Sequence, residues 1–154
     1  MDNSWAHDND HNLWLLISQT RHAIHKLRKN ELSSYNISPV EAGVLSIVKT
    51  LKAKATPANI SRLLIREPNA VSQLLSRMEK KGLVRKNYDL DKKNLVRIEL
   101  TKKGVEKYQQ SKENRKNVSD IMNTLSLEER QRLGSYLQIL KITALKKLGI
   151  ENVK

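Results

Sequence analysis

The chain has 154 residues and carries 29 Lys and Arg against 16 Asp and Glu, a formal net charge of +13. This length suits one small domain with extensions, and the positive charge favours a polyanionic partner. Cysteine is absent, which excludes disulfides and thiol chemistry, and no long apolar run or signal-peptide pattern is present, so we expect a cytoplasmic protein that does not enter membranes.

The N-terminal third predicts a tail and two helices. Residues 1–10 are polar without periodicity, and we expect a flexible tail. Apolar residues then recur every three or four positions from about residue 12 to residue 32, which predicts one long amphipathic helix within residues 11–37. Ser38 to Glu41 form a capping box, with Pro39 at the first position of a second helix that runs into the connection 51–55.

Two short helices with a tight turn between them are predicted next. Thr56 and Pro57 are a hydroxyl cap followed by proline at the first helical position. Arg66 and Glu67 form the turn, and Pro68 begins the second short helix. Gly82 stands where a left-handed residue ends that helix.

The second short helix has one apolar face and one face of hydrogen-bonding side chains. Uncharged amides and hydroxyls with an arginine are the groups that recognise base edges in a DNA major groove, although a solvated surface helix is the ordinary alternative. We predict that the base-reading residues are Asn69, Ser72, Gln73, Ser76 and Arg77.

A charged β-hairpin follows. Val96, Ile98 and Leu100 alternate with polar residues, which predicts a strand with one buried face, and the turn over residues 89–94 is too polar to pack. A basic hairpin tip suits phosphates or a minor groove, although lysines at a tip can serve solubility alone. The predicted contacts to the DNA backbone or minor groove are Thr56, Lys86, Lys92, Lys93 and Arg97.

The C-terminal part predicts two further helices. Thr101 caps a helix over about residues 102–123, whose middle is polar on all sides. A second capping box, Ser126 to Glu129, begins a last amphipathic helix that ends at Gly149. Because amphipathic helices flank the central segment at both ends, we expect their apolar faces to meet across a two-fold axis.

Three segments resemble the MarR (multiple antibiotic resistance regulator) family of transcription factors. They are VSQLLSRMEKKGLV (71–84), DKKNLVRIELT (91–101) and LTKKG (100–104). The resemblance implies a mainly α fold with a small β-hairpin wing: a winged helix-turn-helix at 38–104, flanked by dimerisation helices at 11–37 and 105–150. The family's wing often carries arginine where this chain has Lys92 and Lys93, and lysine offers a point charge instead of a planar fork.

The resemblance also implies a function. It indicates a homodimeric transcriptional regulator, most often a repressor, that binds double-stranded DNA at a pseudo-palindromic operator and is released by a small-molecule effector. The family's effector pocket lies between the dimer layer and the DNA-binding domain, and the candidates to line it here are Trp14, Arg21, Leu45 and Tyr108, although ordinary packing is the alternative for each of them.

Other functions have weaker support. The spacings of His7 with His11 and of His22 with His25 suit metal ligands, but no cysteine accompanies them and we expect no metal. No Gly-rich phosphate loop, nucleophile elbow or HExxH motif is present, so we expect neither an enzyme nor a cofactor. The alternatives that remain are an architectural DNA binder and a winged-helix protein–protein adaptor, neither of which reads sequence.

Overall fold

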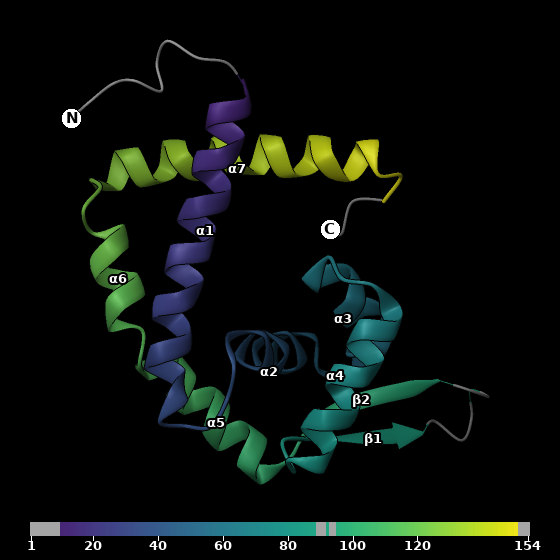
Figure 1. Ribbon diagram of the computed structural model, residues 1–154. Helices are drawn as coiled ribbons and strands as arrows, with labels where there is room; N and C mark the ends of the chain where they lie inside the picture. Colours follow the sequence, from purple (N-terminus) through teal and green to yellow (C-terminus); the bar gives the residue numbers. More distant parts are fainter. Residues whose placement is uncertain (1–9, 89–91, 93–94, 151–154) are drawn as a thin grey trace.

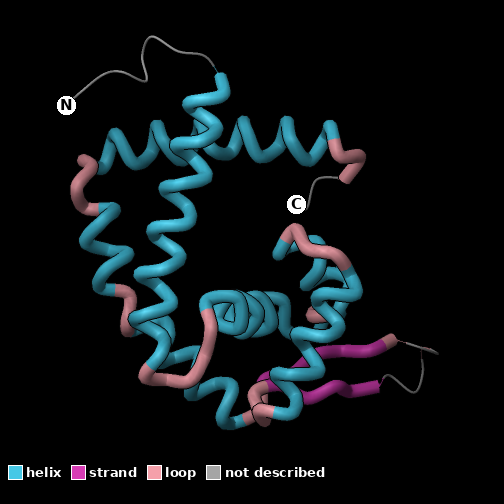
Figure 2. Tube along the Cα trace, viewed as in Figure 1, coloured by secondary structure: helices cyan, strands magenta, loops and turns pink. Residues whose placement is uncertain are grey.

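The structure is a computed structural model that describes residues 10–88, 92 and 95–150, and this part of the chain is mainly helical. Two layers are visible in Figures 1 and 2: a compact lobe that ends in the hairpin, and a frame of helices beside and above it. The elements in chain order are α1 (Asp10–Ser33), α2 (Pro39–Leu51), the 3-10 turn η2 (Lys52–Lys54), α3 (Pro57–Leu64), α4 (Pro68–Lys80), β1 (Val84–Tyr88), β2 (Val96–Leu100), α5 (Lys102–Glu113), α6 (Lys116–Met122) and α7 (Leu127–Lys147).

The predicted helix starts are confirmed by their caps. Ser38 Oγ accepts the N–H of Glu41 at 3.2 Å, and a Glu41 carboxylate oxygen accepts the N–H of Ser38 at 2.8 Å. Ser126 and Glu129 form the same reciprocal pair at the start of α7. Thr56 and Thr101 cap α3 and α5. Each cap satisfies amides that a helix leaves without partners.

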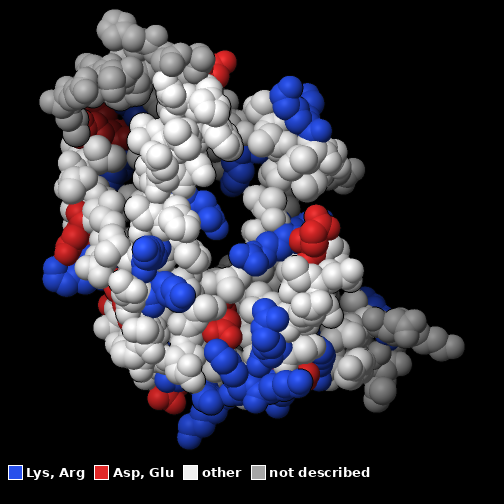
Figure 3. Space-filling model, in the orientation of Figure 1, with Lys and Arg blue, Asp and Glu red and all other residues white. Residues whose placement is uncertain are grey.

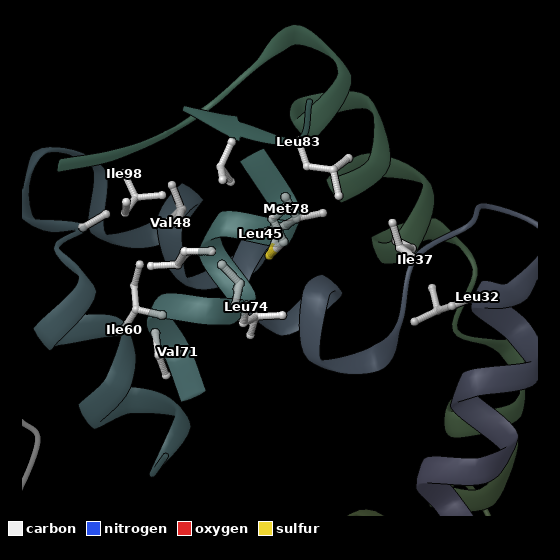
Figure 4. Packing of buried hydrophobic residues seen from close by; sticks show 14 residues of the cluster. Leu32, Ile37, Leu45, Val48, Ile60, Val71, Leu74, Met78, Leu83 and Ile98 are labelled. Carbon is white, nitrogen blue, oxygen red and sulfur yellow. The ribbon is translucent and has the colours of Figure 1, made fainter. Parts of the chain in front are cut away.

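The hydrophobic core lies in the lobe, around α2. Figure 4 shows apolar side chains from α2, α3, α4 and the hairpin converging there, while Leu32 and Ile37 extend the cluster toward the end of α1. Its largest fully buried side chains are aliphatic apart from Met78, as expected for a chain without phenylalanine. The fully enclosed members include Leu32, Leu45, Ile60, Leu75, Met78, Leu83 and Ile98.

The hairpin is fastened to the lobe at its base. β1 and β2 pair antiparallel, with Val84 opposite Leu100 and Tyr88 opposite Val96. The N–H of Ile98 also donates to the carbonyl oxygen of Ala55 at 2.7 Å, so β2 is bonded on both of its edges. A side chain at Gly104 would overlap the carbonyl oxygen of Leu83, which explains the glycine at this position.

The predicted single helix over residues 102–123 is wrong, because α5 ends at Glu113 and α6 begins at Lys116. The break is held by α1. The Arg28 guanidinium donates to the carbonyl oxygens of Ser111, at 2.6 Å, and of Asn114, and a carboxylate oxygen of Glu31 accepts the N–H of Asn117 at 2.6 Å. These side chains replace the intrahelical partners that a continuous helix would have supplied.

Helices α1 and α7 leave large apolar surfaces uncovered. Leu145 is the one buried residue of α7, and Leu32 is the one buried residue of α1. The exposed large apolar side chains of the two helices are Leu13, Trp14, Leu15, Leu16, Ile17, Leu27, Leu127, Leu133, Tyr136, Leu137, Ile139, Leu140 and Ile142. A helix that is apolar on several sides is ordinarily covered on those sides by other elements.

Candidate nucleic-acid interface

Helix α4 presents its polar face to solvent because its apolar face is locked into the core. Val71, Leu74, Leu75 and Met78 are buried, which fixes the rotation of the helix about its axis. The side chains predicted to read bases therefore lie along the outer face. Asn69, Ser72, Gln73 and Arg77 are exposed, and Ser76 is half-buried.

A tight turn sets the angle between α3 and α4. It begins at Ile65, one residue earlier than the sequence suggested, and Ile65 adopts a left-handed conformation with φ of 53°. The buried hydroxyl of Ser61 donates to the carbonyl oxygen of Arg66 at 2.5 Å and closes the turn. The Thr56 hydroxyl accepts the N–H of Asn59, so this predicted phosphate contact is also the cap of α3.

The hairpin contacts α4 through Lys86. Its ammonium donates to Ser76 Oγ at 3.2 Å and lies 3.6 Å from a carboxylate oxygen of Glu79. Glu79 also accepts the backbone N–H of Lys86. Two residues expected to contact different parts of DNA, Ser76 and Lys86, are therefore hydrogen-bonded to each other. No short-range pattern in the sequence indicates this link.

An ion pair joins the two strands of the wing. Arg85 lies 2.6 Å from the carboxylate of Glu99, and the side-chain amide of Asn87 donates to the same group. The hydrogen bond from Asn87 and then the one from Arg85 hold the pKa of Glu99 below its usual value. Figure 1 shows the hairpin projecting away from the lobe.

The predicted wing contacts lie at different places. Arg97 directs its guanidinium to the carbonyl oxygen of Ala53 at 3.0 Å, beside the connection between α2 and α3. Lys92 is exposed, and its carbonyl oxygen accepts the N–H of Leu95. Lys93 lies outside the described residues.

Positive charge gathers on the face that carries α4. Figure 3 shows Lys and Arg side chains concentrated below α4, and a largely uncharged strip over α4 itself. Neutral hydrogen-bonding groups flanked by cations match a duplex, which presents base edges between two rows of phosphates.

The four residues proposed for an effector pocket are dispersed in a single chain. Tyr108 lines a hollow of about 360 Å³ between α1, α2 and α5, together with Arg28, Ser46 and Lys112. Leu45 is fully buried in the core. Trp14 and Arg21 are exposed on α1.

The histidine pairs do not gain further metal ligands within the described chain. His11 stacks near Trp14 with 5.4 Å between ring centres, and residues 10–88, 92 and 95–150 hold no group of three or more His, Asp or Glu side chains suited to a metal. His7 lies outside the described residues. Within the same ranges, no helix is long and apolar enough to span a membrane.

Comparison with known proteins identifies relatives of this chain. Residues 37–104 match the family model described as a winged helix DNA-binding domain. No curated protein sequence matches the chain. The ligand-free structure of the organohalide-sensing RdhR-CbdbA1625 transcriptional regulator is 31% identical, with a TM-score of 0.84, over 100% of this chain and 95% of that one. Its form bound to 2,4-dichlorophenol is 34% identical, with a TM-score of 0.82, over 94% of this chain and 87% of that one.

More distant structures share the fold. The MepR–DNA complex of S. aureus is 20% identical with a TM-score of 0.74, over 88% of this chain and 96% of that one. A MarR mutant from E. coli complexed with operator DNA is 19% identical with a TM-score of 0.71, over 86% of this chain and 99% of that one. The helix-turn-helix, the wing and the flanking helices of this chain thus recur in regulators of one kind. The chain belongs to the MarR family of winged-helix transcriptional regulators, which are DNA-binding proteins and not enzymes.

Proposed function

We propose that the chain is a homodimeric regulator that reads a pseudo-palindromic operator and represses transcription from it. The observation that carries this proposal is the outer face of α4, where Asn69, Ser72, Gln73 and Arg77 are exposed opposite a fully buried face. A rigid helix with forked amides and an arginine on its solvent side has the groups needed for bidentate contacts to base edges.

The dimer is supported by the surface of the single chain. Most of the large apolar side chains that are exposed in the described residues lie on α1 and α7. A second copy packed on these helices would cover them and would set two α4 helices at half-sites about one DNA turn apart.

Release by a small molecule is the remaining element of the proposal. Its support is the 34% identical regulator bound to 2,4-dichlorophenol. Of the four proposed effector residues, Tyr108 lines a described hollow, and it does so where α5 meets α2 of the DNA-binding lobe. A ligand there would contact both layers of the protein. Trp14, Arg21 and Leu45 do not line this hollow. They would line a shared pocket with Tyr108 only after a change of packing, or if the second copy contributed its own residues.

Base reading is tested by Gln73→Ala. We expect its affinity for a selected operator to fall by about 1–3 kcal/mol, because an amide paired with a base edge is lost, while its affinity for random duplex stays close to that of the wild type. Competition binding against both duplexes measures the two values. The control is Gln138→Ala, which removes an exposed amide from α7 and should change neither. Equal losses on operator and random DNA would remove Gln73 from base reading.

A further inference from the structure

A second group of cations continues the line of base-reading residues beyond the end of α4. We call it the lysine patch, and it consists of Lys80, Lys81, Lys102, Lys103 and Lys107. Lys80 lies three and four positions after Arg77 and Ser76, so it occupies the same helical face one turn further on. From Asn69 to Lys80 this face covers about 16 Å along the helix axis.

The patch joins two segments that are far apart in sequence. Lys103 Nζ donates to the carbonyl oxygen of Lys81 at 2.8 Å, which brings the start of α5 against the end of α4. The hydroxyl of Thr101 donates to the carbonyl oxygen of Gly82 at 2.5 Å and fixes the same junction. Lys81, Lys103 and Lys107 line one hollow of about 230 Å³, whose wall contains no carboxylate.

The lysine patch has little compensating negative charge. In the described part of the chain, Lys80, Lys102 and Lys103 form no ion pair, and Lys81 has one, with the buried carboxylate of Glu41 at 2.9 Å. Lys102 and Lys103 also occupy the first turn of α5, where no acidic residue is present. Cations at a helix N-terminus are disfavoured by the helix dipole, so folding of α5 does not account for them.

The position of the lysine patch identifies its partner. Figure 3 shows Lys and Arg gathered over the end of α4 and the start of α5, on the face that also shows α4. The hairpin leaves this junction at Val84 and extends away from it, so the lysine patch and the wing tip lie at opposite ends of the hairpin. If α4 binds a duplex, the lysine patch therefore lies next to the part of that duplex that is opposite to the wing tip.

We propose that the lysine patch binds DNA phosphates outside the contacts of α4 and the wing, with Lys102 and Lys103 as its main contacts. This inference rests on the proposed function, because it assumes that α4 lies in a major groove. The lysine patch adds contacts from the start of α5 to the DNA backbone. Each protomer should therefore cover a longer stretch of DNA at its half-site. Like other phosphate contacts, these contribute affinity and salt dependence without sequence preference.

The test is the salt dependence of operator binding by Lys102→Ala with Lys103→Ala. Each phosphate contact contributes about 0.9 to the slope of log K against log salt, so loss of two contacts per protomer, four in a dimer, makes the slope shallower by about 3.6. Lys102→Arg with Lys103→Arg should keep the wild-type slope. Lys146→Ala with Lys147→Ala removes the same charge from the end of α7, away from the α4–α5 junction, and should also keep it.

The phosphates can then be located by neutral methylphosphonates placed one at a time along the operator. Wild-type protein should show sensitive positions that lose their effect in the alanine variant. The proposed role of the lysine patch would be wrong if the salt slope of the alanine variant were unchanged. It would also be wrong if the slope of the α7 control became shallower by the same amount. A wild-type protein that selects no DNA motif would overturn the proposed function instead, so the two failures are distinguishable. Thermal unfolding of each variant checks that the α4–α5 junction is intact.

Discussion

Single residues in this protein often serve the fold and the proposed interface together. Thr56 caps α3 and is also a predicted phosphate contact. Ser76 faces outward among the predicted base-reading residues, yet its hydroxyl accepts from Lys86 of the wing. A substitution at either position would alter structure and binding at once. Within the part of the chain that the structure describes, the side chains of Gln73 and Arg77 form no hydrogen bond or ion pair, so these positions separate recognition from folding more cleanly.

For a single residue, the structure predicts most directly the effect of Gly104→Ala on stability. A Cβ there would overlap the Leu83 carbonyl oxygen, and because this is backbone, nothing nearby can rotate away. We expect Gly104→Ala to lower the free energy of unfolding by about 1–3 kcal/mol, as other overpacked sites do. Chemical denaturation at fixed protein concentration measures the change.

Gly134→Ala is the matched control, because no atom lies within 4 Å of the added carbon and the site is inside α7. That variant should gain up to about 1 kcal/mol from helix propensity. A Gly104→Ala protein as stable as wild type would show that the hairpin exit is not tightly packed.

At the scale of elements, the break between α5 and α6 depends on α1. The Arg28 side chain is 15% exposed and is hydrogen-bonded to the carbonyls at the end of α5. We expect Arg28→Ala to cost about 1–3 kcal/mol, since the carbonyl oxygens of Ser111 and Asn114 lose a charged donor. Denaturation measures the cost, and hydrogen exchange should be faster for the amides of residues 114–117.

The control is Arg132→Ala, whose ion pair with Glu128 lies on the surface and should change stability by less than about 0.5 kcal/mol. If both variants lose the same stability, the Arg28 contacts do not hold the break.

The sequence predicted those elements whose signals are local. Capping boxes, proline at first helical positions and Gly82 marked the helix ends, and the alternation of Val96, Ile98 and Leu100 marked β2. The break at Asn114 was missed because neither proline nor glycine marks it. Its cause is Arg28, which lies 86 residues away in the sequence. The Lys86–Ser76 contact was missed because it depends on how the hairpin packs against α4, which no local pattern indicates.

Part of the candidate site could likewise be predicted from local sequence signals, and part of it could not. Helical periodicity placed Asn69, Ser72, Gln73 and Arg77 on one exposed face, as the structure has them. The proposed effector residues came from a resemblance alone, and the single chain does not bring them together. A pocket that depends on tertiary packing, or on a second copy, has no local sequence signal.

At the level of the whole molecule, the single chain leaves large apolar side chains of α1 and α7 exposed, which supports the proposed dimer. We expect Leu137→Glu with Leu140→Glu to yield monomers, because two charges would enter the apolar face of α7. Sedimentation measures the mass, and operator affinity should fall because two half-sites are no longer bound together. Gln138→Glu adds charge beside them on the same helix and should leave the dimer intact. A double variant that sediments as the wild type does would exclude this face from the interface.

We propose that α4 reads DNA sequence in a two-fold symmetric arrangement. The most direct measurement is selection of bound duplexes from a random pool by the purified protein near physiological salt, where non-specific binding is weak. We predict a pseudo-palindrome whose half-sites are centred about 10 bp apart. Recovery of no motif, with binding that disappears as salt rises, would contradict the claim and leave an architectural or adaptor role.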